Sequence, residues 1–129
     1  MKSREELFKI SGIILDACIA VHREMGPGLL ESIYILCLCR ELTLRELKVN
    51  REVLIPHFYK GHELSKDFRI DLLVEDEIIL EIKAVDLIHP VHEAQIISYL
   101  KLTDKRLGFL INFNVPLLKN GFKRFVNNF

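Results

Sequence analysis

The stretch FRIDLLVEDEIILEIKAV, residues 68–85, decides the fold, because two apolar runs flank a short polar connection. Each run has the composition of a β-strand, and Asp76 and Glu77 predict a tight connection between them. Charged side chains interrupt the runs at Asp71, Glu81 and Lys83. Charged groups are rarely left on such segments without a partner, so these three side chains require a structural or a chemical reason.

The connection also predicts which of these side chains meet. Residues two apart on a strand share a face, so Glu81 and Lys83 point the same way. Asp71 and Glu81 each lie about five residues from the centre of the connection and would pair across a tight hairpin. Two carboxylates so close repel each other unless a cation lies between them, and oxygen ligands favour Mg²⁺ or Mn²⁺. The alternative is a salt bridge between Asp71 and Lys83, with Glu81 facing solvent.

Helical patterns precede this hairpin. Residues 4–25 carry apolar side chains at helical spacing, and GPG at 26–28 ends the helix. A second helix is predicted from about residue 29 to residue 47. Its expected inward-facing residues are Ile33, Tyr34, Cys37, Leu38 and Leu42.

The rest of the chain alternates between short extended runs and one more helix. Strands are predicted at 49–59, 67–75 and 78–85, a third helix from IHPV at 88–91 to residue 102, and strands at 106–113 and 121–126. The order α-α-β-β-β-α-β-β predicts a mixed central β-sheet flanked by helices, in the α/β or α+β class. We expect one domain over residues 1–129.

Composition restricts the class of protein. Half of the 129 residues are hydrophobic and 28% are charged, as in an ordinary globular protein. We see no leader sequence, and the apolar runs are too short to span a bilayer, so we expect a cytoplasmic protein without a membrane partner. The three cysteines are expected to be reduced core residues.

The formal net charge is zero, but its distribution is uneven. Residues 1–100 carry 12 Lys and Arg against 17 Asp and Glu, whereas residues 101–129 carry six against one. An acidic site facing a basic C-terminal flank would suit a metal plus a phosphate polymer. It would equally suit two subunits that meet head to tail.

Two further segments place polar side chains on helices. In GLLESIY, residues 28–34, Glu31 lies in the first helical turn, where the helix dipole favours a carboxylate. In QIISYL, residues 95–100, Gln95 and Tyr99 share one helical face, with His92 one turn earlier. The polar stripe predicts that this face meets a polar group. The alternatives are a solvated helix start for Glu31 and backbone partners for the amide and the hydroxyl.

The order Glu, Asp, E-x-K, Q-x-x-x-Y resembles the PD-(D/E)XK nuclease superfamily in its RecB-like branch. Gly28-x-x-Glu31-x-x-Tyr34 matches the signature of the small GxxExxY family. RIDLLVE, EIKAV, HEAQIISYLK and GFLINFNV extend the match over nearly the whole chain beyond residue 20. The resemblance implies a restriction-endonuclease-like core, α-β-β-β-α-β, which agrees with the pattern above. Ile70 stands where the superfamily name has proline, a position that does no chemistry.

The resemblance implies a hydrolase that cleaves phosphodiester bonds of nucleic acid with Mg²⁺ or Mn²⁺. Asp71 and Glu81 become metal ligands, with the carbonyl of Ile82 as a third. Lys83 becomes the catalytic lysine. Glu31 becomes the acid on the preceding helix, which binds metal directly or through water.

Nucleic-acid contacts follow from the same resemblance and from charge. Gln95 and Tyr99 match the motif that positions DNA or supports the lysine and the metal. Lys119, Lys123 and Arg124 are candidates to follow a nucleic-acid backbone or to form a solvated edge. DNA is the expected substrate, delivered by a partner or gripped by a homodimer. The alternative function is a nuclease-fold binding or regulatory module with little activity of its own.

The remaining candidate residues have simpler interpretations. His89 and His92 form H-x-x-H at a helix start, but zinc would need two more soft ligands that the sequence does not place nearby. His57 is expected at the surface or in a turn. Arg69 can share a face with Asp71, and a salt bridge is the preferred interpretation over a phosphate contact.

Overall fold

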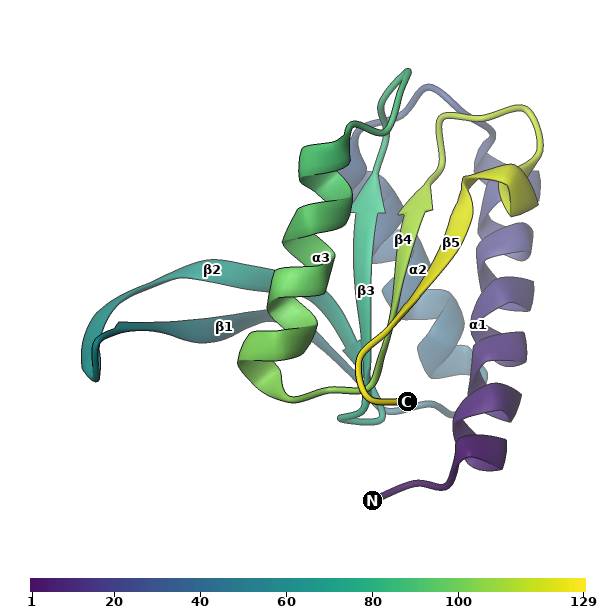
Figure 1. Cartoon of the computed structure of the whole chain (residues 1–129). Helices are drawn as coiled ribbons and strands as arrows, with labels where there is room; N and C mark the ends of the chain where they lie inside the picture. The colour runs from purple at the N-terminus through teal and green to yellow at the C-terminus, as the bar shows by residue number, and fades with distance from the viewer.

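The structure, a computed structural model, describes residues 1–64 and 68–129 with their side chains. A five-stranded sheet in the order β1-β2-β3-β4-β5 lies between helices (Figure 1). The elements are α1 Arg4–Met25, α2 Glu31–Leu44, β1 Val49–Tyr59, β2 His62–Val74, β3 Ile78–Lys83, α3 Pro90–Thr103, β4 Leu107–Asn112, the 3₁₀ helix η1 Leu118–Gly121 and β5 Phe122–Val126. The predicted order and the mixed sheet flanked by helices are confirmed, and the architecture is that of a restriction-endonuclease-like fold.

The sheet is mixed because α3 connects β3 to β4 as a crossover. Strands β3 and β4 run parallel, whereas β1–β2, β2–β3 and β4–β5 are antiparallel. On one face, α3 packs Ile96 and Leu100 against Ile79 and Leu110. On the other face, α1 and α2 bury the larger part of the core against the even-numbered residues of β3. Side chains of β3 therefore alternate between the α3 face and the α1–α2 face.

Two element boundaries differ from the predictions. Helix α2 is shorter than residues 29–47, and Ile33 is 38% exposed instead of facing inward. The buried face of α2 runs through Tyr34, Leu38 and Leu42 at a spacing of four, which leaves Ile33 at its margin.

Strand β2 begins at His62, earlier than predicted, and pairs with β1 along almost its whole length. Strand β3 pairs with β2 at Leu72, Leu73 and Val74. The part of the β1–β2 hairpin that precedes this pairing, residues 53–70, extends past the sheet as an arm beside α3 (Figure 1).

Two other predictions concern the state of the cysteines and the presence of membrane-spanning helices. Cys18 is buried and Cys37 and Cys39 are half-buried, and all three are free thiols, as predicted. Burial raises the pKa of the Cys18 thiol, as expected for an inert core residue. Within the described part of the chain, no helix combines the length and the apolar character needed to cross a membrane.

Candidate active site

Strands β2 and β3 separate at Asp71 and Glu81, beyond the last pair of their ladder. We call this end of the ladder, with its two carboxyl groups, the fork. The ladder runs from Val74–Ile78 to Leu72–Leu80 and ends there. At the next pair of residues, Asp71 and Glu81, side-chain carboxyl oxygens accept the hydrogen bonds in place of backbone carbonyls. Oδ2 of Asp71 accepts a hydrogen bond from the Ile82 N–H at 2.8 Å, and Oε1 of Glu81 accepts one from the Asp71 N–H at 3.4 Å. The predicted meeting of Asp71 with Glu81 is confirmed.

The sheet is also irregular on the other side of Asp71. The register between β1 and β2 is the same at Arg51–Leu72 and at Val53–Ile70, but Glu52 and Asp71 between them are not paired. Glu52 has a left-handed φ of 51°. Unusual backbone conformations of this kind are common beside functional sites. The backbone ladder is therefore interrupted on both sides of Asp71.

The two carboxyl groups of the fork are poorly solvated. Glu81 is only 4% exposed and Asp71 is half-buried, so the alternative of a solvent-facing Glu81 is wrong. Burial raises the pKa of Asp71, an effect that the hydrogen bond from the Ile82 N–H partly offsets. Burial and then the negative charge of Asp71 raise the pKa of Glu81 well above its ordinary value. The interaction between the two side chains raises the pKa of Glu81 and lowers that of Asp71.

Lys83 lies beside this pair without neutralising it. It is half-buried at the end of β3, two residues after Glu81 and on the same face. Its positive charge lowers the pKa of both Asp71 and Glu81. Among the described residues, Lys83 and Asp71 do not form an ion pair, so the salt-bridge alternative does not hold either.

Glu31 lies next to the same strand end. It is the first residue of α2, and its Oε2 accepts a hydrogen bond from the Ala84 N–H at 3.4 Å. Its charge acts on Asp71 and raises the pKa of that carboxyl group. Glu31 is therefore directed at the residue after Lys83 and at the fork, and is not simply a solvated helix start.

Tyr34 fixes the loop that leads to Glu31. The side chain is fully buried, and its ring stacks on Phe113 at 4.6 Å between centroids. Its hydroxyl donates to the Gly26 carbonyl at 2.6 Å and accepts from the Leu29 N–H at 3.1 Å. These two bonds close the loop in which Gly26 takes a left-handed φ of 70°. Tyr34 therefore acts as a positioning residue and does not itself reach the fork.

Gln95 and Tyr99 approach the fork from α3. Tyr99 is 5% exposed, and its hydroxyl hydrogen bonds to the side chain of Gln95. Burial raises the pKa of Tyr99, and the negative charges of Glu81 and Asp71 raise it further. The polar face of α3 thus meets the carboxylates, and the two side chains pair with each other, not with the backbone.

Asn112 is a site residue that sequence reasoning missed. It pairs with Lys83 in the parallel ladder between β3 and β4 and is 3% exposed. Its Oδ1 accepts from the N–H groups of Val85 at 3.1 Å and Asn114 at 3.2 Å. Its Nδ2 donates to the Val85 carbonyl at 2.9 Å. Asn112 therefore fixes the chain directly after Lys83.

Two arginines approach Asp71 from the arm side. A cleft of about 270 Å³ between α2 and the β1–β2 hairpin is lined by Ser32, Ile35, Leu36, Arg51, Glu52, Arg69 and Asp71. The Arg69 guanidinium lies 3.6 Å from a carboxylate oxygen of Glu52, and both side chains are exposed. The preferred salt bridge of Arg69 is confirmed. Sequence reasoning missed Arg51, since its position beside Asp71 depends on the pairing of β1 with β2.

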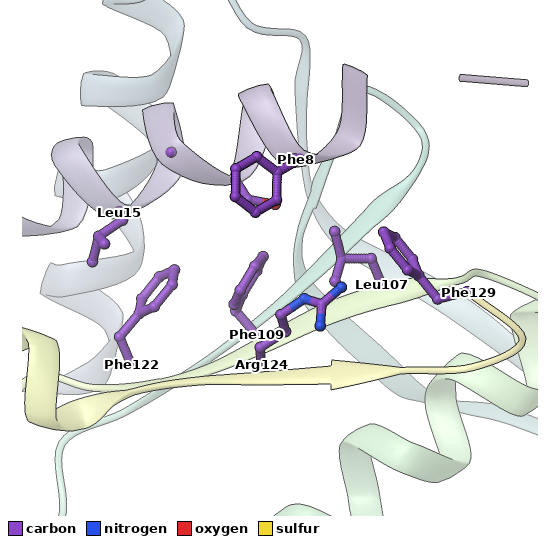
Figure 2. Close-up of a pocket in the computed structure, with 9 residues that line it drawn as sticks. Phe8, Leu15, Leu107, Phe109, Phe122, Arg124 and Phe129 are labelled. Atoms are coloured by element: carbon purple, nitrogen blue, oxygen red, sulfur yellow. The ribbon is translucent and has the colours of Figure 1, made fainter. Parts of the chain in front are cut away.

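The three C-terminal cations are not brought together. The Nζ of Lys123 pairs with Glu93 of α3 at 2.9 Å. Arg124 lies on the opposite face, in an apolar pocket of about 210 Å³ between α1 and β4–β5 (Figure 2), with its guanidinium carbon 4.7 Å from the ring centroid of Phe129. Lys119 belongs to η1. This pocket is separate from the fork, because Glu81 faces α3.

The histidine pair at the start of α3 has a structural role. The His89 N–H donates to Nδ1 of His92 at 3.1 Å, which caps the helix. Among the described residues, no group of three or more His, Cys, Asp and Glu is arranged to hold a metal ion. Mg²⁺, however, is usually held by one or two carboxylates, with water and substrate phosphates completing its shell. The donor set of Asp71, Glu81 and the Ile82 carbonyl fits that requirement, because two buried carboxylates need a proton or a cation between them.

Comparison with known proteins adds one finding. The family model described as the PD-(D/E)XK nuclease superfamily matches residues 8–125. Neither the curated proteins nor the solved structures gave a match. The matched segment contains all the candidate site residues from Glu31 to Arg124.

Proposed function

Because the chain belongs to the PD-(D/E)XK nuclease superfamily, we propose that it is a metal-dependent nuclease that hydrolyses phosphodiester bonds of nucleic acid. Nucleases of this superfamily typically depend on a divalent metal, and membership implies a nucleic-acid substrate. The observation that carries the proposal is the pair Asp71 and Glu81 at the fork, one half-buried and one buried carboxyl group with raised pKa values beside a lysine.

Each side chain has a distinct role in this proposal. Asp71 and Glu81, with the carbonyl of Ile82, would hold Mg²⁺ or Mn²⁺. The bound ion supplies positive charge to the phosphate and lowers the pKa of a water molecule. Lys83 places its ammonium group beside the pair, where it offsets charge that develops on the phosphate oxygens. Glu31 orients water at the end of β3 or ligates the metal.

The supporting residues keep these groups in place. Tyr99 and Gln95 present a hydrogen-bonded hydroxyl and amide to the phosphate and to Lys83 from α3. Asn112 holds the chain after Lys83, and Tyr34 holds the loop before Glu31, so both act as positioning residues. Buried and doubly hydrogen-bonded supports of this kind keep the reacting groups in a fixed geometry.

We extend the proposal to the GxxExxY family and to the RecB-like branch of the superfamily. The hydrogen bonds of Tyr34 support the first assignment, because they run to Gly26 and Leu29, on either side of Gly28, and hold the loop that leads to Glu31. The pairing of Gln95 with Tyr99 beside the carboxylates supports the second.

Calorimetric titration of Mn²⁺ into the wild type, Asp71→Asn and Glu81→Gln tests the metal site. We expect the wild type to bind Mn²⁺ with release of protons, because the pKa values of both carboxyl groups are raised and metal binding favours their ionised forms. Both variants should lose binding and should lose cleavage of plasmid and oligonucleotide DNA. Glu41→Gln, which removes an acid of α2 paired with Arg45, should behave as the wild type. Metal binding that persists in both site variants would refute the assignment.

A second function follows if metal binds but cleavage is absent. The formal net charge of zero and the dispersed C-terminal cations favour a nuclease-fold binding or regulatory module over a strong duplex-gripping enzyme. Such a module would act as a homodimer or with a partner that delivers the nucleic acid. Sedimentation of the wild type with and without DNA separates these states.

A further inference from the structure

A groove lies between α3 and the arm, next to the fork. Its lining residues are His57, Phe68, Val91, Ala94, Gln95, Ser98, Tyr99 and Leu102. Its volume is about 320 Å³, and its walls are largely apolar. In Figure 1 the arm extends to the left of α3. The volume lies within the ~300–1,000 Å³ range of small-molecule pockets.

Aromatic side chains connect the groove to the candidate active site. The rings of His57 and Phe68 are 4.7 Å apart between centroids, and those of Phe68 and Tyr99 are 6.3 Å apart in an edge-on arrangement. Tyr99 packs in the same buried cluster as Ile70, the residue before Asp71, and Ile79, two residues before Glu81. Phe68 is 38% exposed, so part of its ring is open to a ligand. The rings of Tyr99, Phe68 and His57 therefore form a row that begins beside the fork and runs along the arm.

One residue that lines the groove has a polar atom without a partner. Nδ1 of His57 is buried from solvent and, among the described residues, makes no hydrogen bond. A buried polar atom without a partner costs about 1–3 kcal/mol, but this nitrogen exposes almost no surface, so a ligand in the groove contacts the ring and not Nδ1. The prediction of His57 as a surface or turn residue is wrong, because it lies in β1 with its ring against Phe68.

The chemistry of the lining selects the class of ligand. None of the described residues that line the groove is Lys or Arg, so it does not suit a phosphate group. It offers aromatic surface from Phe68 and Tyr99 and an amide from Gln95. A planar group with apolar faces and a polar edge matches this set, and nucleobases have that character.

We propose that this groove binds one unpaired nucleobase of the nucleic acid whose phosphate lies at Asp71 and Glu81. The base packs against Phe68, and its polar edge faces the amide of Gln95. The proposal rests on the nuclease function proposed above. A base inside a duplex has its faces stacked and its edge paired, so the preferred substrate carries a single-stranded segment at this point.

Binding of fluorescent oligodeoxynucleotides, measured by anisotropy with Ca²⁺ in place of Mg²⁺ to suppress cleavage, tests the proposal. The probes are a single-stranded dodecamer, the blunt duplex of the same sequence, and dodecamers with one abasic site at successive positions. We expect the wild type to prefer the single strand over the duplex. An abasic site at one position should weaken binding about tenfold, the effect of one lost stacking contact.

Variants of two phenylalanines on the arm locate that contact. Phe68→Leu keeps an apolar side chain but removes the aromatic face, and we expect it to bind the intact dodecamer about tenfold more weakly. The sensitive abasic probe should lose little further affinity in this variant, because the same contact is already absent. Phe58→Leu is the matched control, since Phe58 is an exposed phenylalanine of β1 outside the groove. Its affinity should equal that of the wild type.

The possible failures are distinguishable. Oligonucleotide binding that ignores both the abasic position and Phe68→Leu would overturn the base site and leave the nuclease proposal standing. A wild type that binds none of the probes would overturn both. A wild type that sediments as a dimer and becomes a monomer on Phe68→Leu, with unchanged oligonucleotide affinity, would assign the groove to a second copy of the chain and overturn the base site.

Discussion

Glu81 and Asn112 are both nearly completely buried, but their burial has opposite consequences. Asn112 is neutral, and its amide makes three hydrogen bonds to the backbone, so its burial stabilises the strand ends. Glu81 is an acid whose burial raises its pKa, beside a second acid. The fork therefore lowers the stability of the fold at neutral pH unless a cation is bound.

Glu81→Gln should stabilise the protein at pH 8 in the presence of EDTA. The folded-state pKa of Glu81 is raised above its unfolded value. Folding thus favours the protonated form, and this contribution is fully present below the unfolded pKa and lost as pH rises through the folded pKa. Glutamine resembles the protonated acid, so the variant should gain about 1.4 kcal/mol for each unit of the raised pKa, with no gain near pH 4. Urea unfolding at pH 4, 6 and 8 measures this, and equal stability at pH 8 would contradict it.

At the scale of elements, the start of α2 depends on a side chain inside the helix. Its N-cap residue, Leu30, has no side-chain hydrogen bond to the helix. The loop before it is held by the Tyr34 hydroxyl, which bonds to Gly26 and Leu29. The start of a helix is usually stabilised by a polar side chain at the N-cap, whereas the start of α2 is stabilised by a tyrosine one turn later.

Tyr34→Phe should lower the free energy of unfolding by about 1–3 kcal/mol, because the Gly26 carbonyl and the Leu29 N–H lose their partner. The stacking on Phe113 remains, so the fold should survive. Denaturant unfolding measures the loss. Tyr59→Phe, at an exposed tyrosine, is the control and should change stability by less than about 0.5 kcal/mol. A loss in the control as large as that in Tyr34→Phe would refute the role of this hydroxyl.

The hairpin was predictable because its information is local. Short apolar runs on both sides of Asp76 and Glu77 locate β2 and β3 and bring Asp71 to Glu81. The true length of β2 was not predictable, since residues 62–66 are largely polar and follow no apolar alternation. Ile33 was misplaced because an isolated apolar residue at the margin of a helix face gives no sign of its direction.

The rest of the site depends on contacts between distant segments. Asn112 reaches Lys83 through a parallel register that forms only after α3 has crossed the sheet. Arg51 lies beside Asp71, and His57 lies beside Phe68, because β1 pairs with β2 along the hairpin. No local spacing in the sequence predicts that these residues are neighbours. The positions of Asp71, Glu81 and Lys83 on two consecutive strands, by contrast, can be read directly from the sequence.

At the scale of the whole molecule, positive charge is distributed away from the fork. The cations that approach it are Lys83, Arg51 and Arg69, and Arg69 is paired with Glu52. Lys123 is paired with Glu93, and Arg124 lies on the other face of the sheet. The described surface near the site therefore offers few contacts to phosphates.

We expect a weak dependence of nucleic-acid binding on salt. Three cations predict a slope of about −2 for log K against log salt concentration with single-stranded DNA. Anisotropy titrations at several NaCl concentrations measure the slope. A slope of about −4 or steeper would mean that further cations contribute, with Lys119, Lys123 and Arg124 as the first candidates.

The fork also has a consequence for the order in which the molecule assembles. Asp71 and Glu81 are only 10 positions apart in the chain, so the loop that joins them closes early and at low entropic cost. Glu31, 53 positions from its partner Ala84, joins through a much longer loop. The contact between Asp71 and Glu81, which has the shortest separation in sequence, is thus also the one in which two negative charges repel each other. Because this conflict lies in a loop that closes early, we expect a divalent ion in solution to accelerate folding as well as to stabilise the folded state.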